Sequence, residues 1–75
     1  MTKQNEDKLL QKFGKRIAEV RKSKGITQSQ LAERVNMSVV TIAYIETGKR
    51  WVRLATLDKI ARALDVSVVE LFRGL

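Results

Sequence analysis

Apolar residues along this chain recur at intervals of three and four positions, which is the spacing of one buried helix face. The first such stripe consists of Leu10, Phe13, Ile17 and Val20. Two further stripes are Leu31, Ala32 and Val35, and then Leu57, Ile60, Ala61 and Leu64. Gly25 stands past the first stripe, where a helix commonly ends. No run alternates apolar and polar residues as a half-buried strand does. The pattern predicts an all-α fold.

Residues able to cap a helix N-terminus stand between these stripes. They are Thr27, Ser38, Thr56 and Ser67. Gln30 and Glu70 follow Thr27 and Ser67 by three residues, which predicts two capping boxes. We expect one compact domain over residues 1–75, with residues 1–7 disordered. The five expected helices cover roughly residues 8–24, 28–35, 38–46, 57–64 and 68–73.

Composition narrows the range of functions. The chain has 75 residues and contains no His and no Cys, so zinc fingers, thiol chemistry and histidine bases are excluded. Because only scattered carboxylates and lysines remain, we expect no enzyme, no metal site and no cofactor. The net charge of +7 favours a polyanionic partner, most often nucleic acid.

The chain shows no targeting or membrane-spanning signal. No apolar run approaches the roughly 18 residues required to cross a bilayer. The N-terminal stretch MTKQNEDKLLQKF is polar and of mixed charge, unlike a signal peptide. We therefore expect a cytoplasmic protein without membrane contact.

The two short helices expected at 28–35 and 38–46 are separated by about three residues, which is helix-turn-helix spacing. In that motif the second helix is presented to the major groove of DNA. Two short helices joined by a tight turn occur in many other proteins, so the spacing alone leaves the function open.

The segments ITQSQLAERVNMSVVTIAYIETGKR and LATLDKIARALDVSVVELF are similar to the lambda-repressor-like, Cro/XRE-type helix-turn-helix family. The similarity runs from about Ile17 to Phe72. It implies a five-helix domain that binds double-stranded operator DNA as a homodimer and regulates transcription, without a small-molecule ligand. Phage Cro proteins and the controller proteins of restriction–modification systems have this size. One departure is Trp51-Val52-Arg53, where many members carry a polar residue followed by Pro-Ser.

One face of the expected third helix points away from the core. At about 100° per residue, Val40 and Tyr44 lie about 160° from Ile42. The resemblance implies that Val39, Val40, Thr41 and Tyr44 meet base edges in the major groove. A valine there would pack on the C5 methyl group of thymine. The alternative is that Val39 belongs to the core edge and Val40 is an ordinary surface residue.

The expected contacts with DNA phosphates are Gln28, Ser38, Lys49, Arg50 and Arg53. The resemblance assigns Gln28 to a phosphate at the N-terminus of the second helix. Lys49, Arg50 and Arg53 follow the third helix in a stretch without acidic residues, as suits a loop that holds the DNA backbone. The alternatives are an ordinary solvated basic loop and, for Arg53, a place in the minor groove.

Two charged residues fall on inner helix faces. Arg21 lies about 40° from Ile17, and Glu46 lies about 40° from Ile42. Because an unpaired buried charge is costly, we expect the two to form a structural ion pair. The resembling family has such a pair at the matching positions. The alternative is that Arg21 extends its charged end to water.

The C-terminal segment carries apolar residues that suggest an interface. The face of the last helix that we expect to pack on the core comprises Val68, Leu71, Phe72 and Leu75. Val69 points about 100° away from it, where related sequences often carry a polar residue. The candidates for a dimer interface are Trp51, Val52, Val69 and Leu75.

The leading hypothesis is a dimeric, sequence-specific regulator acting on a palindromic operator. The rival is an antitoxin-like or other protein-interaction module with secondary DNA binding.

Overall fold

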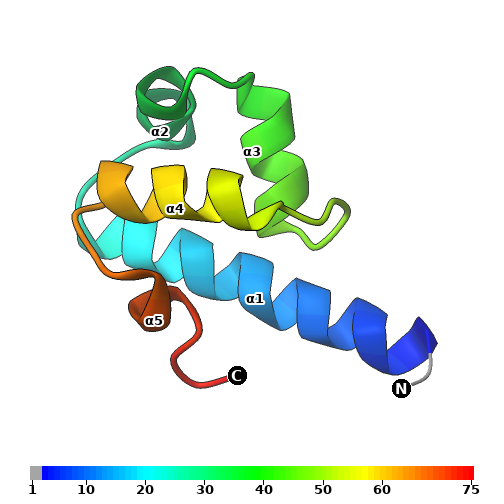
Figure 1. The fold of residues 1–75 in the computed structure, drawn as a ribbon. Helices are drawn as coiled ribbons and strands as arrows, with labels where there is room; N and C mark the ends of the chain where they lie inside the picture. The colour runs from blue at the N-terminus through cyan, green and yellow to red at the C-terminus, as the bar shows by residue number, and fades with distance from the viewer. Residues whose placement is uncertain (1–2) are drawn as a thin grey trace.

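The computed structural model describes residues 3–75, and all regular elements in that range are helices (Figure 1). They are α1 (Lys3–Ser23), α2 (Gln28–Val35), α3 (Val39–Glu46), α4 (Leu54–Ala63) and α5 (Val68–Leu71). This confirms the predicted all-α fold of five helices. None of the helices in this range combines the length and the apolar character that crossing a membrane requires.

Local capping explains where three of the helices begin. Thr27 accepts a hydrogen bond from the Gln30 N–H at 3.0 Å, and Gln30 accepts one from the Thr27 N–H at 2.9 Å, so the first capping box is confirmed. Ser38 accepts from the Thr41 N–H at 3.1 Å at the start of α3. Ser67 caps α5 in the same way, accepting from the Glu70 N–H.

The predicted capping box of Ser67 and Glu70 is wrong for the Glu70 side chain. The Glu70 carboxylate does not turn back to Ser67. It pairs with Arg73 at 2.7 Å and with Arg16 at 3.6 Å instead. The Arg16 guanidinium also donates to the Glu70 carbonyl oxygen at 3.0 Å. Two cations from outside the short helix α5 thus attract the acid more strongly than one N–H, and Arg16 ties α5 to α1.

Three predicted helix boundaries are corrected. Helix α1 begins at Lys3 rather than at residue 8, because residues 3–7 contain no helix-stopping Gly or Pro; residues 1 and 2 lie outside the described residues. Helix α4 begins at Leu54, so Thr56 lies inside it and Arg53 takes the N-cap position. Helix α5 ends at Leu71, and the chain continues in tight i to i+3 turns towards Gly74, whose φ is +85°.

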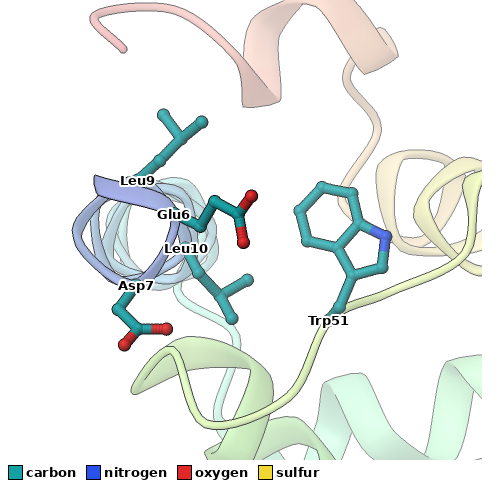
Figure 2. A pocket seen from close by; sticks show the side chains of 5 residues that line it. All are labelled: Glu6, Asp7, Leu9, Leu10 and Trp51. Atoms are coloured by element: carbon teal, nitrogen blue, oxygen red, sulfur yellow. The ribbon is translucent and has the colours of Figure 1, made fainter. Parts of the chain in front are cut away.

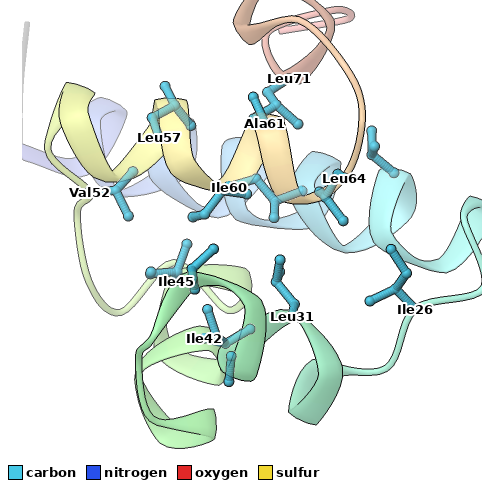
Figure 3. Packing of buried hydrophobic residues seen from close by; sticks show 14 of the residues in the cluster. Ile26, Leu31, Ile42, Ile45, Val52, Leu57, Ile60, Ala61, Leu64 and Leu71 are labelled. Carbon is cyan, nitrogen blue, oxygen red and sulfur yellow. The ribbon is translucent and has the colours of Figure 1, made fainter.

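The core forms where α4 meets the other helices. Helix α4 packs on α2 and α5, while α1 packs on α3 and α5. Figure 3 shows Ile60 of α4 facing Ile42 and Ile45 of α3 across the core, whereas Leu57 lies on the other side of α4. All four side chains are at most 2% exposed, as the stripes in the sequence predict. Their burial fixes the orientation of α3, and therefore which of its side chains remain outside.

Helix α1 crosses the C-terminal end of α3 in unusually close contact. A Cβ atom at Gly14 would overlap the carbonyl oxygen of Ile45 and lie 2.8 Å from that of Glu46. A Cβ atom at Gly48, which follows α3 with φ +75°, would lie 2.7 Å from the Cα atom of Gln11. The two glycines let the backbones meet directly, so α3 is held at its far end as well as along its core face.

Candidate nucleic-acid interface

Helices α2 and α3 are joined by a turn of residues 36–38. Asn36 ends α2 in the left-handed conformation with φ +56°, which Asn tolerates better than most residues. The Met37 N–H then bonds to the Ala32 carbonyl oxygen at 2.9 Å. Ser38 starts α3 immediately afterwards. The expected helix-turn-helix over residues 28–46 therefore forms, with its turn closed by hydrogen bonds.

The outer face of α3 carries the apolar residues that we expect to read DNA. Val39, Val40 and Tyr44 are 42%, 54% and 46% exposed. Val40 is the more exposed valine, while Ile42 on the opposite face is 1% exposed. The Thr41 hydroxyl lies 2.8 Å from the Ser38 hydroxyl, which caps the helix by accepting from the Thr41 N–H. The result is an exposed apolar surface at the start of a helix whose other side is fully packed.

A basic loop follows this helix. The Lys49 ammonium lies 5.9 Å from the centre of the Tyr44 ring, and the Lys49 N–H bonds to the Tyr44 carbonyl oxygen at 2.8 Å. Arg50 and Arg53 are exposed. Within residues 3–75, no salt bridge engages Lys49, Arg50 or Arg53. Three positive charges beside α3 are therefore uncompensated by nearby acids.

The N-terminus of α4 adds a feature that the sequence pattern does not predict. Arg53 holds the N-cap position in extended conformation, but its side chain makes no capping hydrogen bond. The first-turn N–H groups of α4 and the positive end of its dipole therefore adjoin the basic loop. The sequence does not predict this N-terminus, because Thr56 is the usual type of capping residue and Arg53 is not. The predicted helix therefore starts too late.

Arg21 and Glu46 lie together, as expected from their inner helix positions. The Arg21 Nε donates to Glu46 Oε2 at 2.6 Å, and Nη2 donates to Oε1 at 3.0 Å. Their side chains are 8% and 4% exposed, so Arg21 does not extend to water. Its Nη1 donates to the Ile26 carbonyl oxygen at 2.7 Å. The expected phosphate ligand Gln28 joins this group, donating from Nε2 to Glu46 Oε1 at 2.9 Å.

Two of the four interface candidates share an apolar groove. Trp51 and Leu75 line it together with Leu9, Phe13 and Phe72. The Phe13 ring lies 4.9 Å from that of Phe72 and 5.9 Å from that of Trp51, measured between ring centres. Phe72 and Leu75 are 42% and 44% exposed, so the expectation that they pack in the core is corrected. They lie beyond the end of α5, which removes them from its inner face.

The other two candidates differ in their surroundings. Val52 is 5% exposed and belongs to the core, so it is not available to an interface, contrary to the expectation. It anchors the loop just before α4, and Trp51 is left on the surface beside it. Figure 2 shows Trp51 across a second pocket from Glu6 and Leu10 of α1. Val69 is 74% exposed on α5 and does not line the groove.

Comparison with known proteins gives consistent matches. The family HTH_3, described as helix-turn-helix, matches residues 17–71. The control protein C.MunI of a Mycoplasma species is 34% identical over 65 residues, which cover 85% of this chain and 88% of that protein. The immunity repressor protein of Bacillus phage phi105 is 42% identical over 55 residues, 73% of this chain, but the chain spans only 38% of that repressor's length.

Solved structures agree. The crystal structure of the restriction-modification controller protein C.AhdI from Aeromonas hydrophila has a TM-score of 0.82 and 40% identity. The match covers 84% of this chain and 96% of that one. The wild-type controller protein C.Esp1396I follows with a TM-score of 0.77 and 36% identity, covering 85% and 83% of the two chains.

These relatives are named as repressors and controller proteins, in agreement with the expectation that the chain is no enzyme. The chain therefore belongs to the HTH_3 helix-turn-helix family and carries the DNA-binding domain of a transcriptional regulator.

Proposed function

We propose that the protein is a homodimeric regulator that recognises a palindromic operator by inserting α3 into the major groove. The observation that carries this proposal is the outer face of α3, where Val39, Val40 and Tyr44 are exposed beside an uncompensated basic loop. An exposed apolar helix face has no folding role when the opposite face already fills the core. The resemblance to controller proteins and phage repressors supports the same reading.

The side chains at the start of α3 suit an apolar form of base readout. An aliphatic side chain packs on the thymine C5 methyl group, which projects into the major groove. Val40 is the most exposed of these residues, and Val39 lies beside it. Tyr44, one turn later, can donate its hydroxyl to a base acceptor or a phosphate. Thr41 is partly committed to Ser38, so we assign it a secondary role in reading bases.

The proposed phosphate contacts flank this face on two sides. Gln28 and Ser38 stand at the N-termini of α2 and α3, where backbone N–H groups and the helix dipole favour anions. Lys49, Arg50 and Arg53 stand in the loop after α3, next to the uncapped N-terminus of α4. Such contacts orient the protein on the duplex without reading its sequence.

The binding free energy should depend strongly on salt. A dimer that neutralises roughly 6–10 phosphates gives a slope of log K against log salt of about −0.9 per phosphate. Replacing Lys49 and Arg50 by alanine removes up to four charges per dimer. The double variant should therefore weaken binding to all sequences alike and flatten the slope by about 3–4. Fluorescence anisotropy between low and moderate salt measures this.

The matched control replaces Lys12 and Lys15 by alanine. These lysines lie beside Arg73 and Leu75 rather than beside α3, and the variant loses the same net charge. Its slope should stay close to that of the unmodified protein. An equal change in both variants would mean that overall charge, and not the loop, supplies the phosphate contacts.

Self-association should depend on the apolar C-terminal surface. A lone helix-turn-helix covers little DNA, whereas a two-fold dimer sets recognition helices about 34–36 Å apart for successive half-sites. Val69 and the groove that includes Trp51 and Leu75 supply exposed apolar area for such a contact. Val69→Asp introduces a charge that the interface must desolvate, so we expect self-association to weaken at least tenfold, which is about 1.4 kcal/mol.

Sedimentation velocity and DNA titration together check this result. Val69→Asp should lose dimers and DNA affinity in parallel. Val40→Asp, an exposed valine on α3, serves as the control that loses DNA affinity but keeps dimers. A Val69→Asp protein that dimerises normally would exclude Val69 from the interface.

A further inference from the structure

Three helices meet at one carboxylate. Glu46 is the last residue of α3, Arg21 belongs to α1, and Gln28 is the first residue of α2. Glu46 Oε1 accepts two hydrogen bonds, at 3.0 Å from Arg21 Nη2 and at 2.9 Å from Gln28 Nε2. The buried pair is therefore also a partner for a side chain that reaches the surface.

The same arginine fixes the chain that leads into α2. Arg21 Nη1 donates to the Ile26 carbonyl oxygen at 2.7 Å, and the Ile26 N–H donates back to the Arg21 carbonyl oxygen at 3.1 Å. The backbone one residue before the Thr27 cap is held by these two bonds. Hydrogen bonds to the Arg21–Glu46 pair thus hold both the side chain of Gln28 and the backbone just before it.

The hydrogen-bond capacity of Gln28 allows a second partner. A glutamine amide nitrogen carries two N–H donors, and Glu46 takes one of them. Gln28 is only partly buried and stands at a helix N-terminus, where the macrodipole favours an anion. Its second N–H is therefore available to a DNA phosphate in an orientation that the first hydrogen bond already restricts.

The positive charge of Arg21 explains how the Glu46 carboxylate can lie close to a DNA phosphate. A carboxylate close to a phosphate would repel it. The guanidinium of Arg21 neutralises Glu46 through two hydrogen bonds, and Glu46 can then hold the Gln28 amide without opposing the DNA. The entropy of ordering a long glutamine side chain is then lost on folding rather than on binding.

We propose that the Arg21–Glu46 pair positions Gln28 for one backbone phosphate in each half-site, in addition to joining the helices. This inference rests on the proposed DNA-binding function. Arg21 and Glu46 act here as positioning residues, since only Gln28 touches the DNA.

A phosphate-resolved binding measurement tests the proposal. The probe is a duplex selected by the unmodified protein from a random-sequence library, carrying one neutral methylphosphonate at each backbone position in turn. The unmodified protein should lose affinity about tenfold at the phosphate bound by Gln28. Gln28→Ala should bind the normal duplex about tenfold more weakly and be insensitive at that position only.

The decisive variant is Arg21→Met with Glu46→Leu. Replacing both members of a buried pair by apolar residues of similar size preserves stability in many proteins. The double variant should lose sensitivity at the same phosphate as Gln28→Ala, and adding Gln28→Ala should weaken binding by less than about twofold. Asp58→Ala with Arg62→Ala removes an exposed pair from α4 and should keep the full pattern.

Three outcomes separate the claims. Retained sensitivity at that phosphate in the folded double variant, or no effect of Gln28→Ala, overturns the positioning role. Failure of the unmodified protein to select any duplex overturns the proposed function itself. If the double variant does not fold, NMR order parameters of the unmodified protein without DNA test the positioning role. The side-chain amide of Gln28 should be more rigid than that of the exposed Gln11. An equally mobile Gln28 overturns the proposal.

Discussion

Replacing Gly14 by alanine is expected to lower the free energy of unfolding by about 3 kcal/mol or more, at the upper end of overpacking effects. In an ordinary helix the same change stabilises by about 1 kcal/mol, so the expected sign is reversed. The cause is backbone: the new methyl group would overlap the Ile45 carbonyl oxygen, and a carbonyl cannot rotate away as a side chain can. The total free energy of unfolding of a domain of this size is about 4–11 kcal/mol, so the loss is severe.

Urea unfolding followed by circular dichroism measures the effect. Gly25→Ala is the control, because Gly25 has φ +69° but nothing within 4 Å of the added methyl group. It should cost only the strain of a left-handed residue, about 1–2 kcal/mol. An alanine at position 14 that leaves stability unchanged or raises it would show that α1 does not press on the end of α3.

Removing one member of the Arg21–Glu46 pair should cost about 3–5 kcal/mol, because the remaining charge stays buried without its partner. Both side chains are less than 10% exposed, which puts the pair in the buried class. Arg21→Met strands the carboxylate, and Glu46→Leu strands the guanidinium. The double variant Arg21→Met with Glu46→Leu should recover most of either loss. A double-mutant cycle in urea measures the coupling.

The exposed pair of Asp58 and Arg62 provides the comparison. Its members are 50% and 81% exposed, and such pairs contribute about 0–1 kcal/mol. Additive losses at Arg21 and Glu46, with coupling as small as that of the exposed pair, would contradict a buried structural role.

The helix-turn-helix was readable from sequence because its signals are local. Thr27 and Ser38 have hydroxyls at cap positions, and Ile42 and Ile45 repeat with the helical period. The partnership of Arg21 and Glu46 was also readable, since each charge falls on an inner face and pairing the two offsets the cost of burying them. In these cases the residue type and its place on the helix carry the information.

Local sequence signals of this kind do not predict where α4 starts or that Val52 is buried in the core. Arg53 is no usual capping residue, and Val52 just before it is buried in the core. The role of Gly14 depends on two helices crossing at one point. A lone glycine within a helical pattern is the signal that could have found it. The hydrogen bond from Gln28 to Glu46 likewise depends on how three helices meet.

The central claim is that the outer face of α3 reads DNA in two symmetric half-sites. The direct measurement is a thymine-to-uracil scan across a duplex selected by the protein from random sequence. Uracil removes only the C5 methyl group, so pairing and backbone are unchanged.

We expect affinity to fall at one or two positions in each half-site, related by the two-fold axis of the duplex, within the roughly 1–3 kcal/mol of a mismatched pair. Val40→Ala should abolish this sensitivity while leaving thermal unfolding nearly unchanged. A flat scan, or sensitive positions without two-fold symmetry, would contradict the claim that the valines of α3 read the operator.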